Sequence, residues 1–111
     1  MKKLFTNYNF EFDKNEKKLL TTFCKQTLKQ ISGDNRFFAE ERAFNSIINK
    51  LSSDAGTIKF TKDERTRLLH QLEENIKYLK SQVKKSWFLK KWLYKSMLNQ
   101  YQNIIEAHFE D

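Results

Sequence analysis

The chain aligns with itself, and this internal repeat limits its fold more than any other feature of the sequence. FEFDKNEKKLL, at residues 10–20, aligns with IKFTKDERTRL, at residues 58–68. Further along, FFAEERAFNSIIN, at residues 37–49, aligns with WFLKKWLYKSMLN, at residues 87–99, after a shift of two more residues. Most matches are in chemical type rather than identity, so chance similarity between amphipathic segments is the alternative. We interpret the pattern as a duplication.

Each repeat is expected to begin with a short strand. YNFEF, at residues 8–12, and TIKF, at residues 57–60, carry aromatic or β-branched residues at alternating positions, as strands with one buried face do. Neither segment is long enough to be stable alone. We therefore expect the two to pair as a minimal antiparallel sheet.

Signals for a helix start follow each strand. Asp13 with Glu16, and Thr61 with Glu64, have the spacing of a capping box, in which each of the two side chains accepts a hydrogen bond from the other residue's backbone N–H. SGDN, at residues 32–35, ends the first helix, because a glycine there can take a left-handed conformation. The apolar residues that share one helix face are Leu20, Cys24, Leu28 and Ile31 in repeat one, and Leu69, Leu72, Ile76, Leu79 and Val83 in repeat two.

The second repeat has no glycine at the matching place, so two structures stay open. Periodicity allows one helix from Thr61 to Phe109, about 70 Å long at 1.5 Å per residue, far beyond the usual length in globular proteins. The repeat predicts instead a break near Lys84–Ser86, and we favour the break.

The expected fold class is mainly α, with four helices in two β-α-α repeats and at most a short two-stranded antiparallel sheet. The absence of proline and the presence of only two glycines also favour helices over an all-β fold. We expect a single domain over residues 1–111, with repeat one at about 8–51 and repeat two at about 57–109.

The net charge of +7 comes from one segment. No acidic residue lies between Glu74 and Glu106. The lysines in this segment are Lys77, Lys80, Lys84, Lys85, Lys90, Lys91 and Lys95. No apolar run has the length of a signal peptide core or a membrane-spanning helix. Because Cys24 is the single cysteine, no intrachain disulfide forms, and we expect a cytoplasmic protein.

The sequence shows no pattern of an enzyme, a cofactor site or a metal site. An EF-hand alignment through Gly56 fails, because it puts Lys62 where Ca²⁺ needs a bidentate carboxylate. His70 and His108 stand apart, without other ligands at metal-site spacing. Cys24 lies on an apolar helix face without a visible base, so we expect a buried thiol. We predict no catalytic, cofactor-binding or metal-binding residues.

Residues 86–99 hold the candidate binding surface. A helix from Trp87 puts one apolar stripe toward the core, formed by Trp87, Tyr94, Met97, Leu98, Tyr101 and Ile105. Several aromatic, leucine and polar residues fall outside this stripe. The predicted partner-binding residues are Lys85, Phe88, Leu89, Lys91, Trp92, Lys95 and Asn99. The alternative is that Phe88 and Trp92 pack on the other repeat and the lysines are only solvated.

Three kinds of partner fit this surface, and homodimerisation stays open. An acidic protein partner comes first, because aromatic anchors among cations are typical of interfaces; the chain would then be a small binding module or inhibitor. A nucleic-acid partner comes second, with lysines on phosphates and Trp92 or Phe88 stacked on bases, although no arginine follows Arg67. A membrane surface comes third, because the lysines are spread around the helix rather than gathered on one side.

Overall fold

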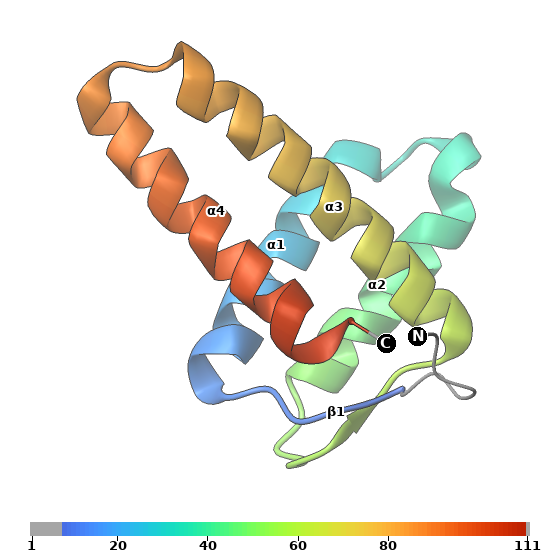
Figure 1. Ribbon diagram of the computed structural model, residues 1–111. Coiled ribbons are helices and arrows are strands. Elements are labelled where there is room, and N and C mark those ends of the chain that lie inside the picture. The colour runs from blue at the N-terminus through green and yellow to red at the C-terminus, as the bar shows by residue number, and fades with distance from the viewer. Residues whose placement is uncertain (1–7, 111) are drawn as a thin grey trace. The chain divides into compact units, whose positions relative to one another are not determined.

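The computed structural model describes residues 8–110, and most of them are helical (Figure 1). The elements in chain order are β1 (Asn9–Phe10), α1 (Lys14–Ile31), a 3-10 helix η1 (Asn35–Phe37), α2 (Phe38–Leu51), β2 (Ile58–Lys59), α3 (Lys62–Lys85) and α4 (Phe88–His108). The prediction of a mainly helical chain with a short two-stranded sheet is confirmed. The chain forms two compact units, one up to Leu68 and the other at Leu69–Glu110, so the division falls inside α3.

In the first unit, β1 and β2 pair antiparallel, with Phe10 opposite Ile58 and Asn9 opposite Lys59. The Phe60 N–H donates to the Tyr8 carbonyl oxygen at 3.0 Å and extends the pairing. Two-residue strands have little stability of their own. They are held by aromatic packing on their buried face, where the Phe10 ring lies 5.3 Å from that of Phe12 and 5.1 Å from that of Phe60, centroid to centroid.

Both predicted capping boxes form. The Glu16 N–H donates to Asp13 Oδ1 at 2.7 Å, and the Asp13 N–H donates to Glu16 Oε1 at 2.9 Å. At the start of α3, the Glu64 N–H donates to Thr61 Oγ1 at 3.1 Å, and the Thr61 N–H donates to Glu64 Oε1 at 2.8 Å. Each box satisfies two N–H groups that a helix start would otherwise leave without a partner.

The core of the first unit lies where α1 packs on α2, next to the strand pair (Figure 1). Its buried side chains come from α1 (Leu20, Phe23, Cys24, Ile31), from α2 (Ala43, Phe44, Ile47, Leu51) and from the strand region (Phe10, Phe12, Ile58, Phe60). Gly33, at φ 83°, ends α1 in the left-handed conformation that the SGDN segment predicts. Lys17 Nζ donates to the Ala55 carbonyl oxygen at 3.0 Å and ties α1 to the loop before β2.

In the second unit, α3 ends at Lys85, the chain reverses at Ser86 and Trp87, and α4 begins at Phe88 (Figure 1). The predicted break is therefore confirmed, and one long helix is excluded. Side chains of α3 and α4 line one shallow pocket, among them Ile76 and Ile105, so the two helices run alongside each other there. The buried apolar residues of this unit are Leu72, Leu79, Tyr101, Ile104 and Phe109.

The predicted core stripe of α4 is wrong at one position. Trp87 is exposed, because it lies outside the helix: it is the N-cap of α4, with an extended backbone at φ −60° and ψ 157°. Because the backbone of Trp87 is not helical, the helical period does not predict where its side chain points. Of the rest of the stripe, Tyr101 is buried, and Tyr94, Met97, Leu98 and Ile105 are half-buried.

Candidate functional site

The four most exposed large apolar side chains of the second unit lie at the turn between α3 and α4, with Leu93 next to them on α4; Tyr78, 55% exposed, lies apart from them on α3. Their exposed fractions are 82% for Trp87, 75% for Phe88, 71% for Leu89, 74% for Trp92 and 52% for Leu93. We call these five residues the hairpin tip. Single exposed apolar residues are common on proteins, but large exposed apolar patches usually mark an interaction site or an aggregation hazard.

Local backbone geometry explains why the hairpin tip is exposed. The Ser86 N–H donates to the Gln82 carbonyl oxygen at 3.0 Å and completes the last turn of α3, and the Lys91 N–H donates to the Trp87 carbonyl oxygen at 2.7 Å and closes the first turn of α4. Trp87, Phe88 and Leu89 are consecutive at this helix start. Consecutive helical side chains point about 100° apart, so the three cannot all face one core.

The start of α4 differs from the starts of α1, α2 and α3 in its charges. Its N-cap, Trp87, makes no side-chain hydrogen bond to the helix, as is also true at α2, but unlike those three helices its first turn holds no acidic residue. Lys90 and Lys91 stand in that turn instead. Cations near a helix N-terminus are unfavourable for the helix dipole. Helix stability therefore does not explain why the first turn of α4 has lysines and no acidic residue.

Apolar residues lie on two sides of α4. Phe88, Leu89, Trp92 and Leu93 have the spacing of one helix face in its first two turns, and all four are more than half exposed. Tyr101, further along α4 and on the opposite side from this face, is buried. A helix that packs on only one side needs only one apolar face. Packing within the chain therefore does not explain why Phe88, Leu89, Trp92 and Leu93 are apolar.

Lysines surround the hairpin tip. Lys84 and Lys85 end α3, Lys90 and Lys91 lie in the first turn of α4, and Lys95 follows one turn later. All are exposed except Lys91, which is half-buried. Within residues 8–110, none of these five lysines forms an ion pair. The apolar side chains of the hairpin tip therefore lie among positive charges that no ion pair within residues 8–110 neutralises.

Six of the seven predicted partner-binding residues lie between the end of α3 and the third turn of α4, and the seventh, Asn99, lies in the middle of α4. Phe88, Leu89 and Trp92 are strongly exposed, and Lys85, Lys95 and Asn99 are exposed. Sequence reasoning missed two members of the tip, Trp87 and Leu93. The sequence does indicate that Trp87 is exposed, because the predicted break near Lys84–Ser86 places it at the turn. Leu93 follows Leu89 by four residues, which places it on the same helix face.

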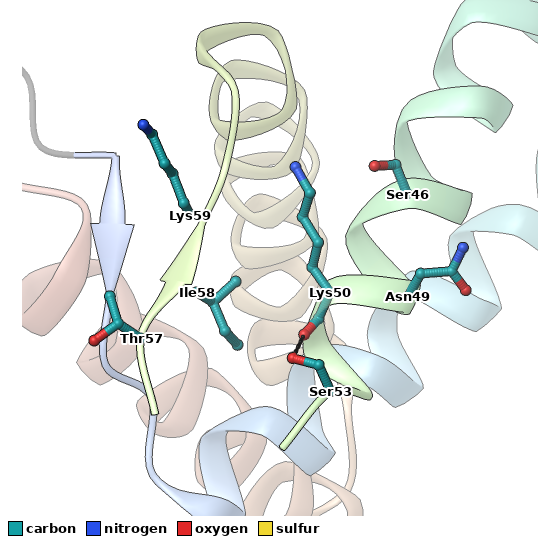
Figure 2. Close-up of a pocket in the computed structure, with 7 residues that line it drawn as sticks. All are labelled: Ser46, Asn49, Lys50, Ser53, Thr57, Ile58 and Lys59. Carbon is teal, nitrogen blue, oxygen red and sulfur yellow. Dashed lines mark hydrogen bonds between the residues drawn. The ribbon is translucent and has the colours of Figure 1, made fainter. Parts of the chain in front are cut away.

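A pocket in the first unit offers polar groups but no converging set. It has a volume of about 370 Å³ and is lined by Ser46, Asn49, Lys50, Ser53, Thr57, Ile58 and Lys59. Figure 2 shows the Thr57 hydroxyl and the Asn49 amide pointing away from each other. Ser53 donates to the Lys50 carbonyl oxygen at 2.8 Å, and Thr57 donates to Glu11 Oε1 at 3.4 Å. The Ser53 and Thr57 hydroxyls therefore form hydrogen bonds within the chain.

The Lys50 side chain at this pocket is paired with Glu64. Lys50 Nζ donates to Glu64 Oε1 at 2.5 Å, and Ser46 Oγ donates to Glu64 Oε2. Burial alone would raise the pKa of Glu64, but the hydrogen bonds from Lys50, Ser46 and the Thr61 N–H outweigh it and lower the pKa. The charged carboxylate thus joins α2 to the start of α3, and we assign it a structural role.

The remaining titratable groups show no catalytic arrangement in the part of the chain described. Burial raises the pKa of the Cys24 thiol to about 12, so the thiol stays protonated at neutral pH. Residues 8–110 contain no group of three or more His, Cys, Asp or Glu side chains that could hold a metal ion. No helix among them is long and apolar enough to cross a membrane.

Comparison with protein-family models, with curated protein sequences and with solved structures found no match to this chain.

Proposed function

We propose that this chain is a small non-enzymatic binding protein that engages an acidic partner protein through the hairpin tip. The observation that supports the proposal is the exposure of Trp87, Phe88, Leu89, Trp92 and Leu93, each more than half accessible, in the one lysine-rich segment of the chain. Large rigid rings at the centre of a patch with charges around it are the usual anatomy of a protein interface.

The size of the tip supports a protein partner. An aromatic side chain offers roughly 150–250 Å² for burial, so three exposed rings and two exposed leucines present several hundred Å² of apolar surface. That is near the upper end of what a monomer usually exposes. It also approaches the roughly 800 Å² that one partner contributes to a standard interface.

The lysines indicate the sign of the partner's charge. They would steer an acidic protein toward the tip and disfavour basic ones. A nucleic acid would gain the same attraction, but the tip lacks arginine, which reads base edges and phosphates bidentately. The acidic protein is therefore the partner we propose, and the nucleic acid and the membrane surface become outcomes of the test.

We also propose that the two halves arose by duplication. In the strand pair, Phe10 lies opposite Ile58, which is its own counterpart in the sequence alignment. An antiparallel pair related by a local two-fold axis has this register. The two capping boxes, at Asp13 and Thr61, also occupy aligned positions.

The proposed function predicts a tip-dependent protein partner. Wild-type protein, a Trp92→Ala variant and a Phe38→Ala control are used as baits in extract of the source cells. Phe38 is a matched control because it is an aromatic of α2 that is 60% exposed. An acidic protein held by the wild type and the control, but not by Trp92→Ala, is the expected result, because a buried aromatic anchor contributes about 2 kcal/mol or more.

The same three proteins are then mixed with short DNA, short RNA and anionic vesicles at two salt concentrations. Tip-dependent binding to nucleic acid, falling about a thousandfold between 50 and 200 mM salt as expected for six phosphate contacts, would contradict the protein proposal. Capture of the same proteins by all three baits would contradict any role for the tip.

A further inference from the structure

We infer that the partner presents an acidic amphipathic helix, which packs across the outer face of the first two turns of α4; this inference rests on the proposed function. The outer face consists of Phe88, Leu89, Trp92 and Leu93. Residues four apart on a helix form a ridge, and two such ridges, Phe88–Trp92 and Leu89–Leu93, stand side by side here. In helix packing, a ridge of one helix fits between two such ridges of the other.

The length of this face limits how the partner helix can lie. After Leu93, the positions that continue the outer face are Ser96, Asn99 and Gln100, which are polar, and both Asn99 and Gln100 are exposed. A coiled coil would need apolar residues at such positions for several more turns. A helix that crosses α4 at an angle of about 50° contacts only a short stretch. The partner helix therefore crosses α4 rather than running along it.

The charges beside the outer face specify the partner helix further. Lys91 and Lys95 are four residues apart and lie along one edge of the face, and Lys84 and Lys85 end α3 just before the turn. Carboxylates next to the apolar stripe of the partner would meet these ammonium groups. A second copy of the tip would bring lysines against lysines, which costs binding energy and disfavours tip-to-tip self-association.

The two tryptophans of the chain, Trp87 and Trp92, both lie in the hairpin tip. Intrinsic tryptophan fluorescence therefore reports on the tip without background from the rest of the protein. The two rings are placed differently: Trp92 belongs to the outer face of α4, whereas Trp87 lies at the turn, outside the helix. A helix bound across the outer face should cover Trp92 more than Trp87. A surface that receives the end of the tip should cover Trp87 first.

The experiment uses two variants, Trp87→Phe, which leaves Trp92 as the reporter, and Trp92→Phe, which leaves Trp87. Each is titrated with a synthetic acidic amphipathic peptide that has leucines at every third and fourth position and glutamates beside them. A peptide of the same composition in scrambled order is the control. We expect a blue shift and loss of acrylamide quenching at Trp92, a smaller change at Trp87, and no change with the scrambled peptide.

Two further variants sharpen the result. Trp92→Ala should weaken peptide binding by about 30-fold or more, which corresponds to loss of a hot-spot aromatic. Lys91→Ala combined with Lys95→Ala should mainly slow association, because edge charges act on the encounter rate. Circular dichroism of each variant checks that the helices are retained.

Each contrary outcome has a defined meaning. If the peptide does not bind, while the captured protein partner binds the wild type and not Trp92→Ala, the helix inference is wrong and the proposed function stands. If Trp87 is protected before Trp92, and anionic vesicles produce the same change, the tip inserts end-on into a lipid surface and the inference is overturned. If capture of the partner does not depend on the tip, both proposals fail together.

Discussion

The start of α2 and the start of α4 occupy aligned positions in the two halves of the chain, and they differ in charge and exposure. Each begins with an aromatic pair, Phe37–Phe38 in one and Trp87–Phe88 in the other, and neither helix has a side-chain cap. The exposed fraction is 38% for Phe37 but 82% for Trp87, and 60% for Phe38 but 75% for Phe88. At both aligned positions, the aromatic side chain at the start of α4 is therefore more exposed than the one at the start of α2.

The surroundings of the two pairs also differ. At α2, the guanidinium of Arg36 lies 5.5 Å from the ring centroid of Phe37, and that of Arg42 lies 5.9 Å from the ring centroid of Phe38. The first turn of α2 carries Glu40 and Glu41, which suit the positive end of the helix dipole. At α4 the first turn has no acidic residue and the rings have no cation over them among the described contacts.

This difference shows which of the two helix starts departs from the rules of folding. The start of α2 follows them in its charges, and the start of α4 contradicts them with exposed rings and lysines at the wrong end of the dipole. Natural proteins depart from such local rules mainly at functional sites. We therefore interpret the hairpin tip, and not the start of α2, as the surface that binds.

The largest expected difference lies one to two turns further along the two helices. Phe44 and Tyr94 occupy aligned positions, but Phe44 is fully buried and Tyr94 is half-buried. Phe44→Ala should destabilise the protein by about 3–5 kcal/mol, the usual cost of deleting a buried aromatic ring. Tyr94→Ala should cost clearly less, because part of its ring is already in contact with water. Urea denaturation of both variants measures the difference, and equal losses would show that the two halves are packed alike.

The two capping boxes give a smaller difference. Glu64 is buried and accepts hydrogen bonds from α2 as well as from Thr61, whereas Glu16 is half-buried and makes the hydrogen bond of the cap at Asp13. Glu64→Ala should cost about 1–3 kcal/mol, since it removes a buried carboxylate that accepts from the half-buried donors of Ser46 and Lys50. Glu16→Ala should cost about 0.5–1 kcal/mol, as for an exposed cap.

The effect of Glu64 should depend on pH. The hydrogen bonds to its carboxylate lower its pKa in the folded protein, so its stabilising contribution is present above the ordinary glutamate pKa of about 4.3. It is lost as the pH falls below that value and the carboxylate is protonated. Denaturation of the wild type and Glu64→Ala at pH 7 and pH 3 should show the difference in stability shrinking at the lower pH. A constant difference would mean that the charge of Glu64 is not what stabilises the junction.

A small change in stability, of the opposite sign, is expected at the start of α4. Trp87 is an N-cap with an extended backbone, which is the conformation in which aspartate caps a helix well. Trp87→Asp should therefore stabilise the protein by about 0.5–1 kcal/mol relative to Trp87→Ala. If the tip binds as proposed, the same change should weaken partner binding. A variant that is more stable and also binds normally would show that Trp87 is not part of the surface.

Local signals in the sequence were sufficient for much of the fold. The capping boxes at Asp13 and Thr61 and the left-handed Gly33 each depend on a few neighbouring residues, and the structure has all three. The break at Ser86 and the antiparallel strand pair are also present, but they are predicted from the alignment of the chain with itself and from the short lengths of the strands. The caps and Gly33 are predictable because their physical causes lie within a few positions of one another.

The exposure of individual apolar residues could not be predicted in the same way. Trp87 keeps the period of the helix, which predicts a place in the core, yet the break removes it from the helix. Ile76 shares a stripe with Leu72, but Leu72 is fully buried and Ile76 is half-buried. Which side of a helix is covered depends on the packing of distant segments, and periodicity alone does not contain that information.

The exposure of the hairpin tip in the free protein is the central claim, and acrylamide quenching of tryptophan fluorescence tests it most directly. Trp87 and Trp92 are the two tryptophans of the chain, and both are more than 70% exposed. The account predicts red-shifted emission and quenching close to that of free tryptophan, unchanged when the protein is diluted. Blue-shifted emission that resists acrylamide at every protein concentration would show that the rings are buried, and would contradict the account.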